Sequence, residues 1–208
     1  MARKYELKRR AERQAQTRRR IVEAAVELHG TVGPARTTVG AIAERAGVER
    51  KTFYRHFPNP DDIFAACAAH FRAQHPPPDP QAWLAIDDPR ARLRRALRDC
   101  YRYYRRHQQL IEHVLRDRQL GLPVGEGFVR HRAAAGHLLA AGFPGDTRQR
   151  RRLKAALELA LDFHTWQTLA HAGLTDRQAV ELTTALVIAA LPPQRGRLAD
   201  DLRSARPA

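Results

Sequence analysis

Six polar side chains stand almost side by side between residues 50 and 56. They are Arg50, Lys51, Thr52, Tyr54, Arg55 and His56. Guanidinium, ammonium, hydroxyl and imidazole groups donate hydrogen bonds to the phosphate oxygens and base edges of DNA. The chemistry that this run offers is therefore recognition of a nucleic acid.

The residues around this run predict two short helices joined by a tight turn. Thr37 is a suitable N-cap for the first helix. Three small or apolar residues supply its inner face: Ile42, Ala43 and Ala46. Gly47 can adopt the left-handed conformation that ends this helix. Val48 would then begin the second helix, with Phe53 and Phe57 four residues apart on its buried side.

Two short helices that meet at a glycine turn are typical of a helix-turn-helix. With Phe53 and Phe57 buried, the polar residues of the second helix face outward, where they suit the major groove of DNA. The alternative is a small helical domain with a solvated basic face, since glycine turns are common. The spacing favours DNA binding over this alternative.

A further helix precedes the pair, and a basic segment precedes that helix. From Thr17 to Gly30, apolar residues recur at helical spacing, and Gly30 can end the helix. Nine basic residues lie at or before its start: Arg3, Lys4, Lys8, Arg9, Arg10, Arg13, Arg18, Arg19 and Arg20. They would form an arm that follows phosphates or enters the minor groove, a disordered leader, or a longer first helix with a basic face.

The segment from Thr17 to Phe64 closely resembles the DNA-binding domain of the TetR family of transcriptional regulators. The resemblance rests on "RRRIVEAAVELHG", "TTVGAIAERAGV" and "TFYRHF", which stand at the spacing of the family. It implies that Thr38 donates to a phosphate and that Arg50 and Lys51 lie nearest the base edges. It also implies phosphate contacts for Thr52, Tyr54 and His56, with Tyr54 able to reach a base.

Three positions depart from the family pattern. Glu49 stands where a capping Ser is common, which brings a carboxylate close to DNA. Lys51 replaces a residue that is often small. Pro60 stands where many members carry a phosphate-binding Lys, so we expect that contact to be missing or moved.

The charge of the chain agrees with an anionic partner. The 208 residues carry a formal net charge of +15. Residues 1–57 hold 14 Lys and Arg against 6 Asp and Glu, a net charge of +8, and the much longer remainder holds +7. Such an excess favours nucleic acid or a membrane surface as a partner, and the basic density lies at the N-terminal end.

Several classes of protein lack their signatures in this sequence. Cys67 and Cys100 give no disulfide framework, and no segment reads as a signal peptide or a membrane span, so we expect a cytoplasmic protein. His164 and His171 lack a third ligand at metal spacing. An enzyme would need a nucleophile with its base, a metal set or a phosphate loop. We find none of these, so we expect no catalytic residue, no metal and no cofactor.

The rest of the chain predicts an all-α protein of about nine helices. The prolines of "HPPPDP" mark a boundary, and long helices follow at about residues 89–106, 108–119, 128–141, 148–171 and 176–191. We divide the chain into a basic extension (1–16), a helix-turn-helix domain (17–64), a helical ligand-binding and dimerisation domain (65–192) and a disordered tail (193–208). The resemblance implies the function of the third part.

The last two predicted helices favour a homodimer. Apolar residues surround both helices: Leu157, Leu159, Leu161, Phe163, Trp166 and Leu169 on the first, and Val180, Leu182, Leu186, Val187, Ile188 and Leu191 on the second. Helices that are apolar all round need burial on more than one side. The same helices of a second copy would supply it, whereas a monomer of this size would hardly cover both.

The resemblance also implies a pocket for a small-molecule effector, which we expect to be apolar or amphiphilic. Candidate lining residues are Tyr101, Tyr104, His107, Phe128, His131, Phe163 and Trp166. The alternative is that they are ordinary core aromatics and half-exposed histidines. The most favoured function is a homodimeric repressor that an effector releases from its operator DNA. The alternatives are an activator and an architectural DNA-binding protein that responds to no ligand.

Overall fold

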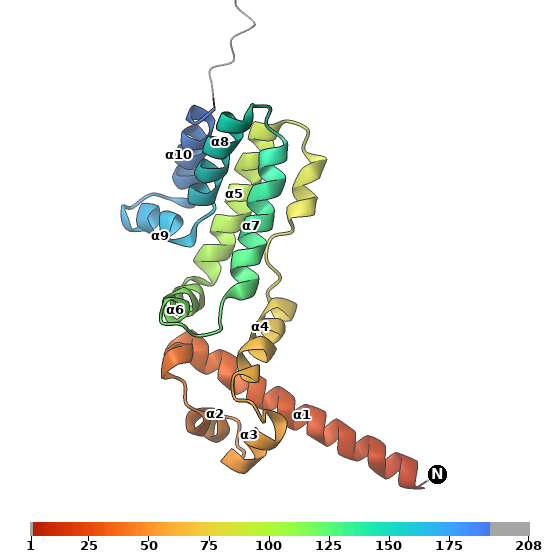
Figure 1. Cartoon of the computed structure of the whole chain (residues 1–208). Coiled ribbons are helices and arrows are strands. Elements are labelled where there is room, and N and C mark those ends of the chain that lie inside the picture. Colours follow the sequence, from red (N-terminus) through yellow and green to blue (C-terminus); the bar gives the residue numbers. More distant parts are fainter. Residues whose placement is uncertain (1, 192–208) are drawn as a thin grey trace, which may run out of the picture. The chain divides into compact units, whose positions relative to one another are not determined.

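The computed structural model describes residues 2–191, with side chains from residue 5 onward. The tail predicted at residues 193–208 lies outside this range, as do the side chains of Arg3 and Lys4. Within the range, the chain forms ten α-helices and two 3-10 helices and has no strand, which confirms the predicted all-α class (Figure 1). None of the helices in this range is both long and apolar enough to span a membrane.

The elements follow one another along the chain as follows: α1 (Ala2–Thr31), η1 (Pro34–Arg36), α2 (Val39–Arg45), α3 (Arg50–His56), α4 (Asp62–Gln74), η2 (Pro80–Ala85), α5 (Pro89–Arg106), α6 (Gln108–Gln119), α7 (Glu126–Ala141), α8 (Thr147–Ala160), α9 (Phe163–His171) and α10 (Asp176–Ala189). The chain divides into two compact units. Among the described residues, the first comprises residues 2–78 and 102–131, and the second comprises residues 79–101 and 132–191. The functional boundary after residue 64 stays a prediction.

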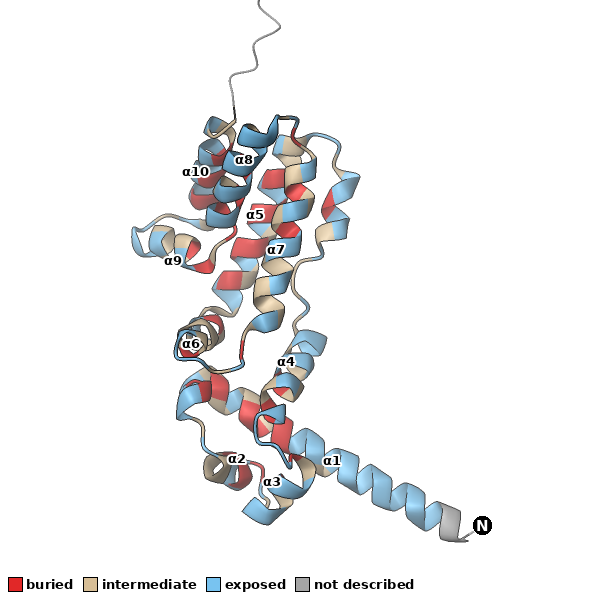
Figure 2. Ribbon diagram, in the orientation of Figure 1, coloured by how far each residue is buried: buried red, intermediate tan, exposed pale blue. Residues whose placement is uncertain are grey.

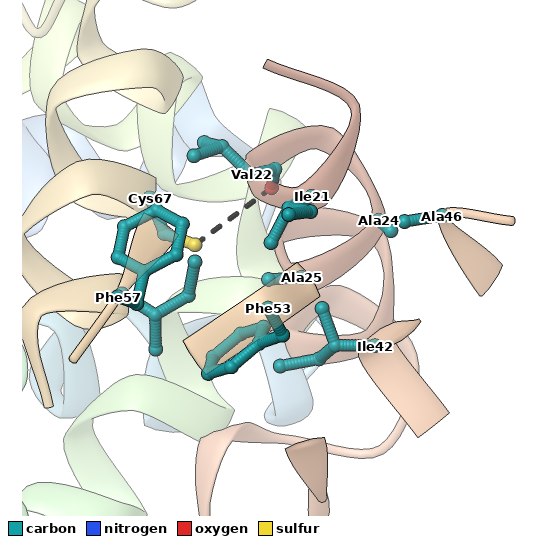
Figure 3. Packing of buried hydrophobic residues seen from close by; sticks show 10 residues of the cluster. Ile21, Val22, Ala24, Ala25, Ile42, Ala46, Phe53, Phe57 and Cys67 are labelled. Atoms are coloured by element: carbon teal, nitrogen blue, oxygen red, sulfur yellow. Dashed lines mark hydrogen bonds between the residues drawn. The ribbon is translucent and has the colours of Figure 1, made fainter. Parts of the chain in front are cut away.

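The first unit is built around an apolar core shared by α1, α2, α3 and α4 (Figure 3). Phe53 and Phe57 are 0% and 1% exposed, as predicted, and their rings lie 5.4 Å apart. Ile21 and Ala25 of α1 are completely buried against the same cluster. Cys67 of α4 joins it with its thiol 3.8 Å from the carbonyl oxygen of Val22. Burying each Phe side chain stabilises the fold by roughly 2–3 kcal/mol.

Helix α1 is much longer than the predicted helix, which began at Thr17. It begins at Ala2 and ends at Thr31, so it includes Gly30. Of the three alternatives for the basic segment, the structure shows the longer helix. The reason is composition, because residues 2–16 contain Ala, Leu, Lys, Arg, Glu and Gln, which are strong helix formers, and no Gly or Pro. Gly33, at a φ of 93°, turns the chain after the helix instead of Gly30.

A buried carboxylate connects α6 to the segment between α1 and α2. Asp117 is completely buried, and its Oδ2 accepts a hydrogen bond of 2.8 Å from the backbone N–H of Ala35 in η1. The other oxygen accepts one of 2.7 Å from Nε of Arg116. Burial disfavours the charged carboxylate, but these hydrogen bonds outweigh it and hold the pKa of Asp117 below its usual range. A β-carbon on Gly33 would lie 2.9 Å from the carboxylate, so this position is close-fitting.

Two histidines lie beside this connection. His29, in the last turn of α1, is 5% exposed, and its ring stacks near Phe64 of α4 at 5.7 Å between centroids. Its carbonyl oxygen lies 3.2 Å from Nδ1 of His113 in α6. Burial lowers the pKa of His29 to about 4, although the charge of Asp117 acts in the opposite direction. His29 is therefore neutral at physiological pH.

The second unit contains a correction to the predicted helix at residues 148–171. The structure ends α8 at Ala160 and starts α9 at Phe163, which gives ten α-helices instead of nine. Asp162 causes the break, because its carboxylate accepts hydrogen bonds from the N–H groups of His164 (2.8 Å) and Thr165 (3.2 Å) and so caps α9. Arg132 forms an ion pair with the same carboxylate.

Helix α10 begins as predicted, and it packs against α8 within the second unit. Thr175 and Gln178 form a capping box, which confirms the prediction for this helix start. Tyr101 of α5 reaches into the same region and donates a 2.8 Å hydrogen bond to the carbonyl oxygen of Ala160. Its hydroxyl also lies 3.3 Å from Oγ1 of Thr183 in α10. This buried bridge ties α5 to α8 and α10.

His29 should make the stability of the chain depend on pH. Between its folded pKa of about 4 and the ordinary value of 6.5, the unfolded chain binds a proton that the folded chain does not. Stability therefore falls as the pH falls through this window. From pH 7 to pH 5 the loss from this residue is about 2 kcal/mol. Urea denaturation at both pH values should show that His29→Gln loses about 2 kcal/mol less than the wild type.

His171→Gln is a matched control, because this histidine is exposed. The control variant should keep the pH dependence of the wild type. Equal losses in the wild type and in His29→Gln would show that the buried environment does not lower the pKa of His29.

Candidate nucleic-acid interface

The helix-turn-helix is formed by α2, the turn at residues 46–49 and α3 (Figure 1). Thr38 caps α2 with its hydroxyl oxygen, which accepts a 3.1 Å hydrogen bond from the N–H of Ala41. The predicted cap, Thr37, is wrong by one residue. Its hydroxyl instead donates a 2.7 Å hydrogen bond to the carbonyl oxygen of Gly33 and so closes the η1 turn. Ile42, Ala43 and Ala46 are buried as predicted.

The turn takes the form that the sequence predicted at Gly47. Its φ of 63° lies in the left-handed region, where a side chain is disfavoured. Arg20 of α1 also approaches this turn, and its guanidinium donates hydrogen bonds to the carbonyl oxygens of Ala46 and, at 3.2 Å, Gly47. A β-carbon on Gly47 would lie 2.9 Å from that guanidinium. Glycine is thus required both for the conformation and for the contact with α1.

Helix α3 begins two residues later than predicted. Val48 is still in the turn, where its N–H donates a 2.9 Å hydrogen bond to the carbonyl oxygen of Ala43. Glu49 is the N-cap residue, although its side chain makes no capping hydrogen bond. Its carboxylate pairs with Lys51 at 2.8 Å. Glu49 and Lys51 both depart from the family pattern, and the positive charge of Lys51 partly neutralises the carboxylate of Glu49.

Much of α3 is exposed or half-buried (Figure 2), and the donor run occupies those positions, whereas Phe53 and Phe57 are buried. Four of its members are exposed, namely Arg50, Lys51, Tyr54 and Arg55, and two are half-buried, namely Thr52 and His56. This pattern follows from the helical period, because burying positions 53 and 57 leaves most of the other positions toward solvent.

The structure brings two of the predicted contact residues together. A β-carbon on Gly40 would lie 3.7 Å from Nε of Arg50 and 3.7 Å from Oγ1 of Thr38. The first turn of α2 and the first turn of α3 therefore present their donors at one edge of the domain. Because Gly40 adds no side chain there, this edge is free for a close approach.

His56 differs from the other members of the run. Its Nε2 atom is buried and has no hydrogen-bond partner. Burial lowers the pKa of His56, and the positive charges of Arg55 and Arg18 lower it further. In the free protein the imidazole is therefore neutral at physiological pH and has one N–H donor.

The sequence interpretation assigned no particular contact to Arg18 and Arg20 of α1. The guanidinium of Arg18 lies 4.5 Å from the centroid of the Phe57 ring, and Phe57 is the C-cap residue of α3. Arg20 holds the turn before α3. Nothing in the local pattern separates these two from the other basic residues of α1. Their roles emerge only when the helices pack.

The effector-pocket candidates fall into two sets, one in each compact unit. Tyr101, Phe163 and Trp166 belong to the second unit and are completely buried. Burial raises the pKa of Tyr101 to about 12. The indole N–H of Trp166 donates a 3.1 Å hydrogen bond to Asp176. This set contributes to the packing of its unit, and a role in binding an effector stays a prediction.

The second set, in the first unit, consists of Tyr104, His107, Phe128 and His131. The rings of Tyr104 and Phe128 lie 5.8 Å apart. His107 belongs to a group of rings at the end of α4 and the end of α5, with centroid distances of 4.7–5.1 Å to its three neighbours: Phe71, His75 and Tyr103. The sequence interpretation did not include those three neighbours. Within the described residues, no group of His, Cys, Asp and Glu is suited to hold a metal ion.

A helix-turn-helix with an outward row of donors defines this molecule as a DNA-binding protein of the transcription-regulator class. Residues 21–67 match the family described as bacterial regulatory proteins, tetR family. This match shows a DNA-binding domain of the tetR type over residues 21–67. A comparison with curated proteins gave no match.

Two solved structures show a similar fold over most of the chain, and a third is similar at a lower score. A TetR-like regulator from Rhodococcus sp. RHA1 is 20% identical, with a TM-score of 0.57 over 83% of this chain and 93% of the other. A second TetR regulator from that organism is 20% identical, with a TM-score of 0.50 over 85% and 98%. The Thermus thermophilus repressor FadR, in complex with lauroyl-CoA, is 21% identical, with a TM-score of 0.47 over 92% and 99%.

Proposed function

We propose that the protein is a homodimeric repressor that releases its operator DNA when a small apolar or amphiphilic molecule binds. The observation that carries DNA recognition is the edge formed by α2 and α3, where Thr38 and Arg50 flank Gly40. The homodimer and the effector are supported by separate observations. Each part of the proposal has its own test.

In the proposed complex, α3 lies in the major groove. Arg50 and Lys51, at its N-terminal end, reach the base edges, and Arg is well suited to bidentate contact with guanine. Thr38 donates to a phosphate at the start of α2. Thr52, Tyr54 and His56 contact the backbone, as does Arg55 by its charge. Exposure of Arg50, Lys51, Tyr54 and Arg55 supports these assignments.

Arg50→Ala should weaken binding to the cognate operator by about 1–3 kcal/mol and relax the preference at one base position. Thr52→Ala should weaken binding by a similar factor at every sequence, because a phosphate contact carries no sequence information. Fluorescence anisotropy with the operator and with each single-base variant measures both effects. Unchanged operator affinity for Arg50→Ala would contradict the proposed docking.

The homodimer is supported by an exposed apolar surface on α8 and α10, which we name the leucine face. It consists of Leu159, Leu182 and Leu186, and their side chains are 66%, 41% and 60% exposed. Helices α8 and α10 pack against each other, and Leu182 and Leu186 are one helical turn apart. The other residues that made these helices apolar all round are accounted for in part by the core, since Leu157, Leu161 and Val187 are buried.

A second copy is the occupant that suits this surface, since a two-fold axis would pair each leucine face with itself. The resulting four-helix contact would hold two recognition helices about 34–36 Å apart, which is one turn of DNA. Half-site recognition by a helix-turn-helix protein needs such a pair. A stable contact of this kind buries at least about 1,200 Å² in total.

Leu186→Glu should convert the protein to a monomer at micromolar concentration, because it places a charge at the centre of the proposed contact. Light scattering should show half the wild-type mass, and operator affinity should fall with it. Leu120→Glu is the matched control, since Leu120 is 69% exposed on the turn that follows α6. This control should remain dimeric. A wild type that is monomeric, or an unaffected Leu186→Glu, would contradict the proposal.

The effector is supported by the aromatic residues of the first unit. Tyr104, His107, Phe128 and His131 offer apolar rings with a few polar atoms, which is the composition of small-molecule sites. They belong to the same compact unit as the helix-turn-helix. In that unit α6 packs against α1 and η1, and Asp117 bonds to Ala35 directly before α2. A ligand that moves α6 would therefore move the segment that leads into the reading helices.

The ligand acts only if it favours a state in which the two recognition helices no longer fit the half-sites. Thermodynamic linkage then requires operator DNA to weaken ligand binding by the factor by which ligand weakens DNA binding. A ligand found by thermal-shift screening should thus bind about 5–150-fold more weakly in the presence of operator, measured by calorimetry. Equal affinities with and without operator would exclude release by that ligand.

An architectural DNA-binding protein is the alternative function. Such a protein would bind operator and random duplexes equally at every salt concentration, because phosphate contacts carry the affinity. A regulator would keep a specificity ratio of about 10³ or more at physiological salt. Transcription from an operator-controlled promoter in vitro separates repression from activation.

A further inference from the structure

Residues 2–16 extend α1 beyond the TetR-type domain, and none of the side chains described there belongs to the core. Residues 5–16 of α1 are all exposed, whereas the core of α1 starts at Ile21 (Figure 2). Figure 1 shows this part of α1 running on beyond α2, α3 and α4. At 1.5 Å per residue, residues 2–16 add about 22 Å of helix. A duplex carries one phosphate charge per roughly 1.7 Å of its axis, so a length of about 22 Å corresponds to about thirteen charges.

Two stripes of charged residues along α1 differ in how their charges are paired. Lys8 and Arg19 lie on one stripe with Glu12 and Glu23, and they pair with these carboxylates at 4.0 Å and 2.7 Å. Arg9 and Arg13 lie on the other, roughly 100° away around the helix. Within the described residues, neither of these two arginines forms an ion pair. We name Arg9 and Arg13 the arginine stripe. Neither guanidinium group is neutralised by an ion pair in the described part of the chain, although Glu6 lies on the same side of the helix.

Contacts further along α1 show which way the arginine stripe faces. Arg20 lies on the same stripe, since eleven residues after Arg9 the helix returns to within about 20° of the same direction. The guanidinium of Arg20 bonds to the carbonyl oxygens of Ala46 and Gly47, in the turn between α2 and α3. The stripe therefore points to the side of α1 on which the helix-turn-helix lies.

We propose that Arg9 and Arg13 contact the phosphate backbone of the DNA that flanks each half-site. The inference rests on the proposed docking of α3 in the major groove. The duplex then lies against the α2–α3 edge, and a straight helix that leaves the domain beside this edge carries the arginine stripe along the duplex. The contact is independent of sequence, because it uses charge alone.

A membrane surface is a less suitable partner for the same helix. An interfacial helix needs one apolar face opposite its charges. The two large apolar residues of the extension are Tyr5 and Leu7, which are 63% and 61% exposed. Two positions apart, they point about 200° from each other, so they form no common face. Basic residues surround the helix instead.

The test compares two double variants of the full chain that lose the same charge. Arg9→Gln with Arg13→Gln removes the arginine stripe, and Lys8→Gln with Arg19→Gln removes the same charge from the stripe that is paired with carboxylates. Glutamine is a good helix former, and circular dichroism verifies that the helical content is unchanged. The probe is a random-sequence duplex of about 40 base pairs, so the measurement needs no knowledge of the operator.

The slope of log Kd against log salt concentration is the readout. The arginine-stripe variant should lose about 1.8 from the magnitude of this slope per protomer, since each phosphate contact contributes about 0.9. Its affinity at about 0.1 M salt should fall by about tenfold or more. The Lys8/Arg19 variant should lose less than half as much of the slope. Equal effects of both variants would show diffuse attraction without a contacting stripe, and so would overturn the proposal.

Two further measurements separate this inference from the proposed function. With an operator obtained by in vitro selection, about ten base pairs of added flank should tighten wild-type binding, and the arginine-stripe variant should lack this gain. If selection yields an operator and the added flanks have no effect on affinity, the inference about Arg9 and Arg13 is wrong, whereas the proposed function as a regulator still holds. The second measurement is binding to vesicles of phosphatidylserine and phosphatidylcholine. If the wild type binds them, the arginine-stripe variant does not, and the salt dependence of DNA binding is the same for both, the stripe binds membranes and the inference is wrong.

Discussion

Burial of Phe53 and Phe57 against α1, α2 and α4 is the interaction on which this structure depends. Helix α3 has only seven residues and would not be stable alone. Once its two rings are inserted among Ile21, Ala25 and Ile42, the helical period determines which side chains remain outside. The apolar contact thus determines which side the polar residues of α3 face, so the proposed DNA-binding surface follows from the packing of the core.

A second constraint sets the position of this reading surface relative to α6. Taking a carboxylate out of water is costly unless its oxygens find donors, and Asp117 finds them in Ala35 and Arg116. The Ala35 amide lies only four residues before α2, so only a short stretch of chain separates the contact with α6 from the helix-turn-helix. This hydrogen bond between Ala35 and Asp117 joins α6 to the segment that leads into the helix-turn-helix.

The sequence predicted those features that depend on local pattern. Phe53 and Phe57 at four-residue spacing, the glycine turn and the capping box at Thr175 all follow from rules within a few residues. The breaks were harder. The apolar residues of the predicted helix at 148–171 recur at helical spacing on both sides of Asp162. This spacing alone does not show that the Asp162 carboxylate caps a new helix. The helical extension was missed for the opposite reason, because its stability comes from helix-forming residues without any apolar stripe.

The burial of the two thiols bears on which signals this regulator can receive. Cys67 lies in the core of the first unit, and its pKa is raised by burial to about 12. Cys100 is likewise buried, and burial together with the charge of Asp99 raises its pKa to about 12. Because both pKa values are raised, only a very small fraction of either cysteine is thiolate at neutral pH. Oxidants and electrophiles react with the thiolate form. In the folded protein both thiols are therefore poorly reactive toward oxidants and electrophiles at neutral pH.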